Sequence, residues 1–188
     1  MAGVLEGIKV LELSIYHAGP AAARMLADMG AEVIKIEDTE GGDPTREITA
    51  VLGSSIMTAK GTSAPWECYN RNKKSISVNL KSPEGRQIIY ALASHIDVFL
   101  TGFTNPTINK LGMDYDTLRQ YNPKLVYAHV SAFGARGPEA DLPGAAWTGQ
   151  ARGGMLLAQR GPDEEPWSRL GLADQMGAIS AAFGVLGA

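Results

Sequence analysis

Residues 8–36 read IKVLELSIYHAGPAAARMLADMGAEVIKI, and this stretch decides the fold. Two apolar runs, 8–13 and 31–36, have the length of buried strands, and the residues between them carry apolar side chains at helical spacing. Pro20 suits the first turn of a helix, where its missing N–H would be unpaired anyway, and Gly30 suits a left-handed exit. The stretch therefore predicts a strand, a helix and a second strand.

The same alternation continues along the chain. The pattern predicts a strand at 75–80 with one polar face, a helix from Ser82, a strand at 97–100, a short helix at 114–121 and a strand at 125–130. Strands and helices that alternate with short connections favour a mostly parallel sheet. We therefore expect an α/β fold, an open Rossmann-like sheet with flanking helices, whose ligands bind at the carboxyl ends of the strands.

Two longer stretches, 38–72 and 134–169, are rich in glycine, proline and polar residues and have no clear period. Loops of this length in compact domains are usually functional or disordered. Four basic residues lie in or just after the first stretch: Arg46, Arg71, Lys73 and Lys74. They either line the entrance to a nucleotide site or belong to an ordinary solvated surface.

The composition excludes several classes of protein. With 188 residues, of which 45% are hydrophobic and 20% charged, the chain can form one globular domain with a core. Its net charge of −3 provides no basic surface for a nucleic acid, and no apolar run approaches the roughly 20 residues of a membrane helix. Cys68 is the single cysteine, which fits a reducing cytosol, and the three histidines lack metal-ligand spacing. We therefore expect a cytoplasmic protein with no metal site and with neither nucleic acid nor membrane among its partners.

Residues 170–188, LGLADQMGAISAAFGVLGA, contain a single charged side chain, Asp174. Four apolar residues after it have helical spacing and predict an apolar stripe: Met176, Ile179, Phe183 and Leu186. Near the start of such a helix, Asp174 is a cap that accepts backbone hydrogen bonds, or a nucleophile with an ionised and partly desolvated oxygen, or both. The helix has no exit signal before the last residue, so we expect a piece of a longer protein.

The turn after the first strand, SIYHAGP at 14–20, lacks the glycine-rich fingerprint of dinucleotide-binding proteins. Other short motifs follow one another in order: LEGIKVL at 5–11, AGP at 18–20, GAEVIKIE at 30–37, GD at 42–43, NKKSI at 72–76, LKSPEG at 80–85, NP at 122–123, SAFG at 131–134, GP at 137–138 and AD at 173–174. Together they resemble the class III CoA-transferases, of the formyl-CoA and carnitine type. The resemblance implies that residues 1–188 are the N-terminal part of the large Rossmann-like domain, with the second domain absent from this chain.

The resemblance also implies a reaction. Asp174 matches the family's nucleophile, which attacks an acyl-CoA, forms a mixed anhydride and then an aspartyl-CoA thioester, and returns CoA to a small carboxylic acid. Tyr16, His17 and Ala18 match the turn where CoA meets the reacting centre. There, His17 either steadies an acyl oxygen as a donor or bonds to backbone at the strand end. CoA and acyl-CoA would be substrates, and no cofactor would be permanently bound.

Three further positions match CoA contacts in the family: Val78, Lys81 and Lys110. The two lysines are suited to phosphates as point charges, although Lys81 could equally be a solvated charge at a helix start. Lys110 replaces an arginine of some members, which removes a bidentate contact, and Asp38 stands where some members have a basic residue. Members form interlocked homodimers in which a second domain and a glycine-rich loop complete the active site, and the same is implied for the complete protein.

Two alternatives to a transferase remain open. Related 2-methylacyl-CoA racemases use a histidine about thirty residues before the aspartate, and the aligned position here is Ala145, so a proton exchange between two bases would lack one base. The other alternative is a non-catalytic subunit or fragment that retains part of a CoA pocket.

Overall fold

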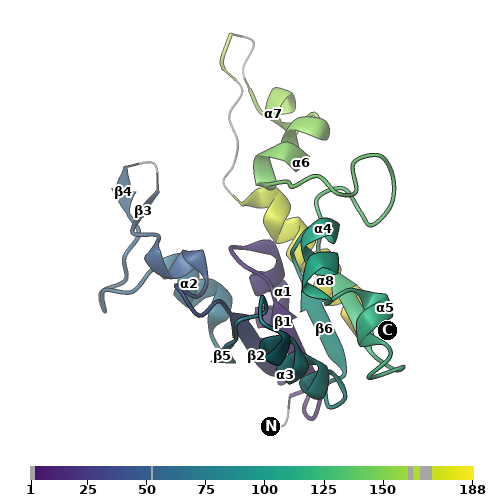
Figure 1. Cartoon of the computed structure of the whole chain (residues 1–188). Helices are drawn as coiled ribbons and strands as arrows, with labels where there is room; N and C mark the ends of the chain where they lie inside the picture. The colour runs from purple at the N-terminus through teal and green to yellow at the C-terminus, as the bar shows by residue number, and fades with distance from the viewer. Residues whose placement is uncertain (1–2, 52, 161–162, 166–170) are drawn as a thin grey trace.

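A computed structural model describes residues 3–51, 53–160, 163–165 and 171–188. Its main element is a five-stranded sheet in the order β5-β2-β1-β6-β7. The strands are β1 (Lys9–Leu13), β2 (Glu32–Glu37), β5 (Lys73–Ser77), β6 (Val98–Thr101) and β7 (Val126–His129), and all neighbours are parallel. The predicted α/β fold with a mostly parallel sheet is therefore confirmed (Figure 1).

The order of the strands places a switch point at β1. The chain proceeds from β1 to β2 and β5 on one side, and then returns to pair β6 with the other side of β1. In open parallel sheets, ligands bind beyond the carboxyl ends of the strands at such a reversal. The segment that follows Leu13 therefore lies where such a ligand would bind.

Helices cover both faces of the sheet because successive strand residues point to opposite sides. On one side, Leu11 and Phe99 pack with α3 (Pro83–Ala93), α4 (Asn105–Leu111) and α5 (Tyr115–Leu118). On the other side, Val10 and Val33 pack with α1 (Ala18–Asp28) and α8 (Leu172–Leu186). Local signals fix several ends: Ser82 accepts a hydrogen bond from the backbone N–H of Gly85, and Asp114 caps α5 in the same way.

Small residues bring α1 and α8 close together. Ala21, Ala22 and Ala23 of α1 are fully buried, and Ala178 and Ala182 are the buried residues of α8. Alanine adds little bulk between two helix backbones, so the first turns of α1 and α8 come to lie side by side. This contact places residue 17 beside residues 174 and 175.

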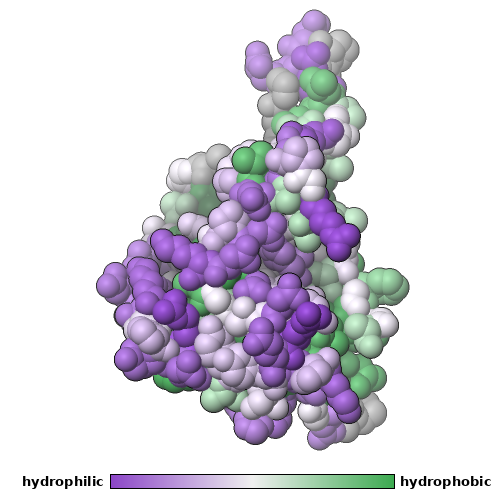
Figure 2. Space-filling model, turned by 45° about the vertical axis from the view of Figure 1, so that its right-hand side comes forward, coloured by the Kyte–Doolittle hydropathy of each residue, from purple (hydrophilic) through white to green (hydrophobic). Residues whose placement is uncertain are grey.

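The predicted apolar stripe of α8 exists but is not the buried face. Met176, Ile179, Phe183 and Leu186 are between 46% and 76% exposed. The alanines, not the large residues, meet α1, so the predicted stripe is left exposed. Hydrophobic residues also gather along the right-hand side of the molecule in Figure 2.

The two stretches predicted to be irregular contain short elements. The first holds a 3-10 helix η1 (Pro44–Glu47), a hairpin of β3 (Ala50–Val51) and β4 (Ser54–Ser55), and α2 (Ala64–Asn70); the second holds α6 (Ala146–Arg152) and α7 (Met155–Ala158). Each is too short to show a helical or strand period in the sequence, as is α4. Residues 161–162 and 166–170 of the predicted loop and final stretch lie outside the described residues.

The strand predicted at 75–80 lies two residues earlier, at 73–77, so Val78 and Leu80 are buried just beyond the carboxyl end of β5. Within the described ranges, no helix combines the length and the apolar character needed to cross a membrane.

Candidate active site

The turn at the end of β1 carries the first group of candidate residues. Tyr16 has a φ of 65°, a left-handed conformation that is strained for a residue with a side chain. Its backbone N–H donates to Asp43 Oδ1 at 3.4 Å, and its own side chain is half exposed. Ala18 begins α1 directly after the turn. The turn thus projects His17 from the switch point toward α8.

His17 lies against the first turn of α8. Its Nδ1 is 3.5 Å from Asp174 Oδ2, and its Nε2 is 3.3 Å from Gln175 Oε1. The side chains of His17 and Asp174 are 17% and 30% exposed, so both are partly desolvated and still reachable. The described part of the chain offers the His17 ring no backbone hydrogen bond, so the interpretation of a strand-end histidine bonded to backbone is wrong.

Asp174 is not the cap of α8. Gly171, with a φ of 73°, is the N-cap residue, and no side chain makes a capping hydrogen bond. Asp174 is the third helical residue and remains in the first turn, where the helix dipole favours a carboxylate. The capping prediction is wrong because the helix starts three residues earlier than a cap at Asp174 requires, and this leaves the carboxylate free to face His17.

A cavity of about 520 Å³ lies at the carboxyl end of the sheet. It brings together three predicted CoA contacts that are separate in sequence, Val78, Lys81 and Lys110. Its lining also includes Ser14 and Ile15, the first residues of the turn that ends in His17. Tyr16, His17, Ala18 and Asp174 do not line the cavity, so the structure divides the predicted residues into two adjoining groups joined by one turn.

Lys81 and Lys110 are exposed at this cavity, and neither has an ion-pair partner among the described residues. Such free ammonium groups beside an apolar side chain like Val78 suit a ligand with both phosphate and apolar parts. Asp38 lines the same cavity and contributes the opposite charge.

The four other basic residues are engaged elsewhere. The ion pairs are Arg46 with Glu37, Arg71 with Asp28, Lys73 with Glu12 and Lys74 with Glu32. Arg46 also lies over the ring of Trp66, with 3.5 Å from its guanidinium carbon to the ring centroid. These residues therefore belong to structural pairs and do not line the cavity.

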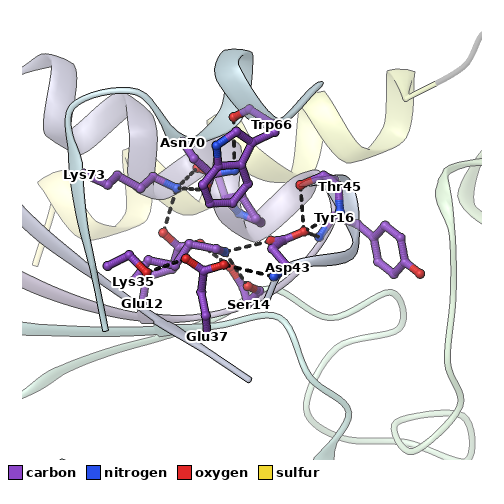
Figure 3. A network of polar contacts seen from close by, with 12 residues as sticks. Glu12, Ser14, Tyr16, Lys35, Glu37, Asp43, Thr45, Trp66, Asn70 and Lys73 are labelled. Atoms are coloured by element: carbon purple, nitrogen blue, oxygen red, sulfur yellow. Dashed lines mark hydrogen bonds and ion pairs between the residues drawn. The ribbon is translucent and has the colours of Figure 1, made fainter. Parts of the chain in front are cut away.

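A buried charge cluster lies beneath the turn, and we define it as Glu12, Lys35, Asp43 and Lys73 (Figure 3). Lys35 Nζ is 2.9 Å from both Glu12 Oε1 and Asp43 Oδ2, and Lys73 Nζ is 2.7 Å from Glu12 Oε2. Two cations thus balance two carboxylates, as burial requires. Burial lowers the pKa of Lys73 to about 8 despite the attraction of Glu12.

Burial alone would lower the pKa of Lys35 as well, but the carboxylates of Glu12 and Asp43 raise it above its ordinary value. Sequence reasoning missed this cluster, although one signal was available. Glu12 and Lys35 are charged residues inside apolar runs that were themselves predicted to be buried strands.

No group of three or more His, Cys, Asp or Glu side chains within the described ranges could hold a metal ion. In the part of the chain that the structure describes, the candidate site has a carboxylate and an imidazole beside a cavity lined by two lysines without an ion-pair partner there.

The fold is that of an α/β protein with a cavity at the carboxyl ends of its parallel strands. The model of CoA-transferase family III matches residues 5–188, and the chain belongs to this family.

Relatives and solved structures agree with this assignment. The chain is 39% identical to cinnamoyl-CoA:phenyllactate CoA-transferase of Clostridium sporogenes, over 98% of this chain and 45% of that protein. It is 41% identical to succinate--glutarate CoA-transferase of Agrobacterium fabrum, over 86% of this chain and 40% of that protein. A crystal structure of a CAIB/BAIF family protein from Brucella suis matches with a TM-score of 0.88 at 32% identity, covering 100% of this chain and 49% of that one. The chain spans about half the length of the proteins that it matches.

Proposed function

We propose that the complete protein moves CoA from an acyl-CoA donor to a carboxylic acid acceptor, with Asp174 as the covalent nucleophile. The observation that carries this proposal is the Asp174 carboxylate, partly desolvated, 3.5 Å from the imidazole of His17 and in the first turn of a helix. Covalent catalysis by a carboxylate needs such an ionised and oriented oxygen. Membership of a CoA-transferase family supplies the class of reaction.

The proposed sequence balances without an added proton or oxidant. An oxygen of Asp174 attacks the thioester carbonyl, the C–S bond breaks, and CoA leaves as the thiolate from a mixed anhydride. The thiolate then attacks the aspartyl carbonyl and displaces the donor carboxylate, which leaves an aspartyl-CoA thioester. The acceptor carboxylate repeats these two steps in reverse order, so that a new acyl-CoA forms and the Asp174 carboxylate returns.

His17 is proposed to hold an oxygen of the reacting carboxyl group through Nδ1. A positioned donor beside the carbon under attack stabilises the charge that develops on oxygen in each tetrahedral intermediate. Tyr16 and Ala18 would contribute through the backbone of the turn, because they lie on either side of His17.

The cavity is proposed to hold part of CoA. Lys81 and Lys110 would meet phosphate groups, and Val78 would meet an apolar portion of the ligand. A volume of about 520 Å³ is within the usual range for small-molecule sites. In this proposal CoA binds as a substrate and not as a permanently bound cofactor.

The complete protein is proposed to contain more than the domain described above. We infer that residues 1–188 are the N-terminal part of the large domain, and that a second domain completes the site in an interlocked homodimer. The exposed apolar stripe of α8 supports the proposal that another part of the complete protein covers it, since Phe183 is 76% exposed in this chain. A cytoplasmic location suits the single cysteine, Cys68.

A racemase is less well supported. Ala145, at the position where a racemase needs a second base, precedes α6 as its N-cap residue and has no group that could carry a proton.

The test is intact mass of the complete protein after incubation with succinyl-CoA or cinnamoyl-CoA, followed by trapping with hydroxylamine. We expect a mass change on the peptide that contains Asp174, and none in an Asp174→Asn variant of unchanged circular dichroism. CoA binding without any adduct would overturn the covalent mechanism and favour a non-catalytic subunit. Exchange of the α proton of a 2-methylacyl-CoA would favour a racemase.

A further inference from the structure

The imidazole of His17 is enclosed by residues from two segments, α2 and the start of α8. Tyr69 of α2 stacks on it, with ring centroids 4.1 Å apart and an interplanar angle of 15°. Gly171 lies so close that a Cβ at that position would be 2.7 Å from His17 Cε1. Asp174 and Gln175 lie at the two ring nitrogens. Because the His17 ring is contacted on one face and at both nitrogens, it is held in a single orientation.

We propose that Tyr69 is a positioning residue, which fixes the plane of the His17 imidazole so that Nδ1 faces Asp174. This rests on the proposed function of His17 and Asp174. The Tyr69 hydroxyl has no hydrogen-bond partner among the described residues, so its packing contact with the site is the stack on His17. Burial, together with the nearby Cys68 and Asp174, raises the pKa of the Tyr69 hydroxyl, and a Tyr69→Phe variant separates this electrostatic contribution from the stack. The contribution comes from the flat face of the ring, which aligns a second flat ring as a smaller or flexible side chain cannot.

The helix that carries Tyr69 is itself tied to the helix that follows His17. Figure 3 shows Lys73 reaching toward Glu12 and Asn70. Lys73 Nζ donates to Asn70 Oδ1 at 3.0 Å and to the carbonyl oxygen of Pro20 at 2.8 Å. Asn70 directly follows Tyr69, and Pro20 lies in the first turn of α1, so one buried ammonium group joins the two segments that carry the stacked rings.

This arrangement gives the buried charge cluster a role beyond stability. Buried ion pairs often contribute little net stability, because desolvation offsets the attraction between the charges. Here the Lys73–Glu12 pair fixes a lysine whose remaining hydrogen bonds set the distance between α1 and α2. The stack of Tyr69 on His17 depends on that distance.

The experiment compares Tyr69→Leu with Tyr69→Phe in the complete protein, using succinyl-CoA and cinnamoyl-CoA as donors. Phenylalanine retains the aromatic face, whereas leucine removes it. Because a misplacement of about 1 Å can cost about a hundredfold in rate, we expect Tyr69→Leu to lower kcat by about tenfold. We expect KM to stay within about twofold, since substrate contacts are unchanged, and Tyr69→Phe to keep the wild-type rate.

A second readout does not depend on activity. The rate at which diethyl pyrocarbonate modifies His17, followed by peptide mass spectrometry, should rise several-fold in Tyr69→Leu and stay unchanged in Tyr69→Phe. If Tyr69→Leu does not fold, Tyr69→Met replaces it, because methionine fills a similar volume without a ring.

The outcomes separate the two proposals. Wild-type protein that transfers no CoA from either donor would overturn the proposed function, while the modification rates would still test the stack. Equal modification rates in the leucine and phenylalanine variants would overturn the role of Tyr69, whatever the activity. Loss of activity in both variants would also overturn it, because the phenylalanine ring preserves the proposed contact.

Discussion

At the scale of single residues, the cations of this chain separate into two kinds. Arg46, Arg71 and Lys73 are held by carboxylates, and the side chain of Lys73 is also buried. Lys81 and Lys110 lie at the cavity without an ion-pair partner among the described residues. An ammonium group without an ion-pair partner is available to a ligand. Substitutions of these two lysines therefore test ligand binding better than substitutions of the paired residues.

We expect Lys81→Ala and Lys110→Ala each to raise the KM for an acyl-CoA by about fivefold, since one exposed charge contact contributes roughly 1 kcal/mol. The value of kcat should not change, because neither lysine is near Asp174 in the proposed mechanism. Steady-state kinetics at low and high salt checks this, as added salt should reduce the difference from wild type. Lys124→Ala, at an exposed position outside the cavity, is the control. An equal change in KM for Lys124→Ala would argue against specific contacts.

At the scale of elements, the start of α8 decides the geometry of the site. Gly171 gives the chain a left-handed residue before the helix and leaves room for the His17 ring. Gly154 starts α7 with nearly the same conformation, φ 71° against 73°, but a Cβ there would meet no atom within 4 Å. Substitutions of the two glycines therefore distinguish two effects. Both would strain a left-handed backbone, but only a substitution of Gly171 would also crowd the His17 ring.

We expect Gly154→Ala and Gly171→Ala each to lose about 1 to 2 kcal/mol of stability from the left-handed backbone. Only Gly171→Ala should also lower kcat strongly, because its Cβ would displace the imidazole from Asp174. Thermal unfolding and steady-state kinetics measure the two effects. If both variants kept the wild-type kcat, the close packing of His17 on Gly171 would not matter for the reaction.

The ion pair between Glu37 of β2 and Arg46 of η1 should make the stability of the fold decrease at low pH. Burial alone would raise the pKa of Glu37, but hydrogen bonds from Arg46, Ser75 and the backbone of Asp43 lower it from 4.5 to about 2. A carboxyl group whose pKa is lower in the folded state stabilises the fold above the unfolded value, and the contribution is lost as the pH falls.

Glu37 should therefore contribute its full stabilisation above about pH 5 and lose it progressively down to about pH 2. We expect Glu37→Gln to be less stable than wild type at pH 7 and to show a smaller fall in stability between pH 5 and pH 3. Urea unfolding at several pH values tests this, with Glu84→Gln at the exposed start of α3 as the control. An unchanged acid slope in Glu37→Gln would contradict the assignment.

At the scale of the whole molecule, the chain presents an apolar helix face to solvent. Ile179 and Phe183 of α8 are 46% and 76% exposed, while Ala178 and Ala182 of the same helix are buried. Contiguous exposed apolar side chains usually mark an interface. Such a face agrees with a chain that spans about half the length of its relatives.

We expect the 188-residue chain, produced alone, to self-associate through this face. Replacing both Ile179 and Phe183 by serine should shift the population toward the monomer, because the apolar area available for contact falls. Light scattering coupled to gel filtration measures the mass of each species. Ile88→Ser, which alters an equally exposed residue on α3, is the control and should have no effect. A wild-type chain that stays monomeric at high concentration would contradict the prediction.

The sequence by itself determined the alternation of strands and helices, and with it the mostly parallel α/β sheet. Apolar runs, the spacing between Pro20 and Gly30 and the cap at Ser82 are local signals, and each acts on residues close to it in the chain. The ordered series of short motifs from residue 5 to residue 174 was likewise sufficient to indicate the family. The short helices α2 and α6 left no comparable signal, because fewer than two full turns establish no period.

Only the tertiary structure decided which residues meet. His17 and Asp174 are far apart in the sequence, and they approach because buried alanines of α1 and α8 let the two helices pack closely. The same packing turned the large apolar residues of α8 outward, a direction that their spacing alone did not indicate. Tyr69 and the buried charge cluster depend likewise on contacts between distant segments. The period of a helix fixes which residues share a face, but the partner of that face is set by shape and volume across the whole fold.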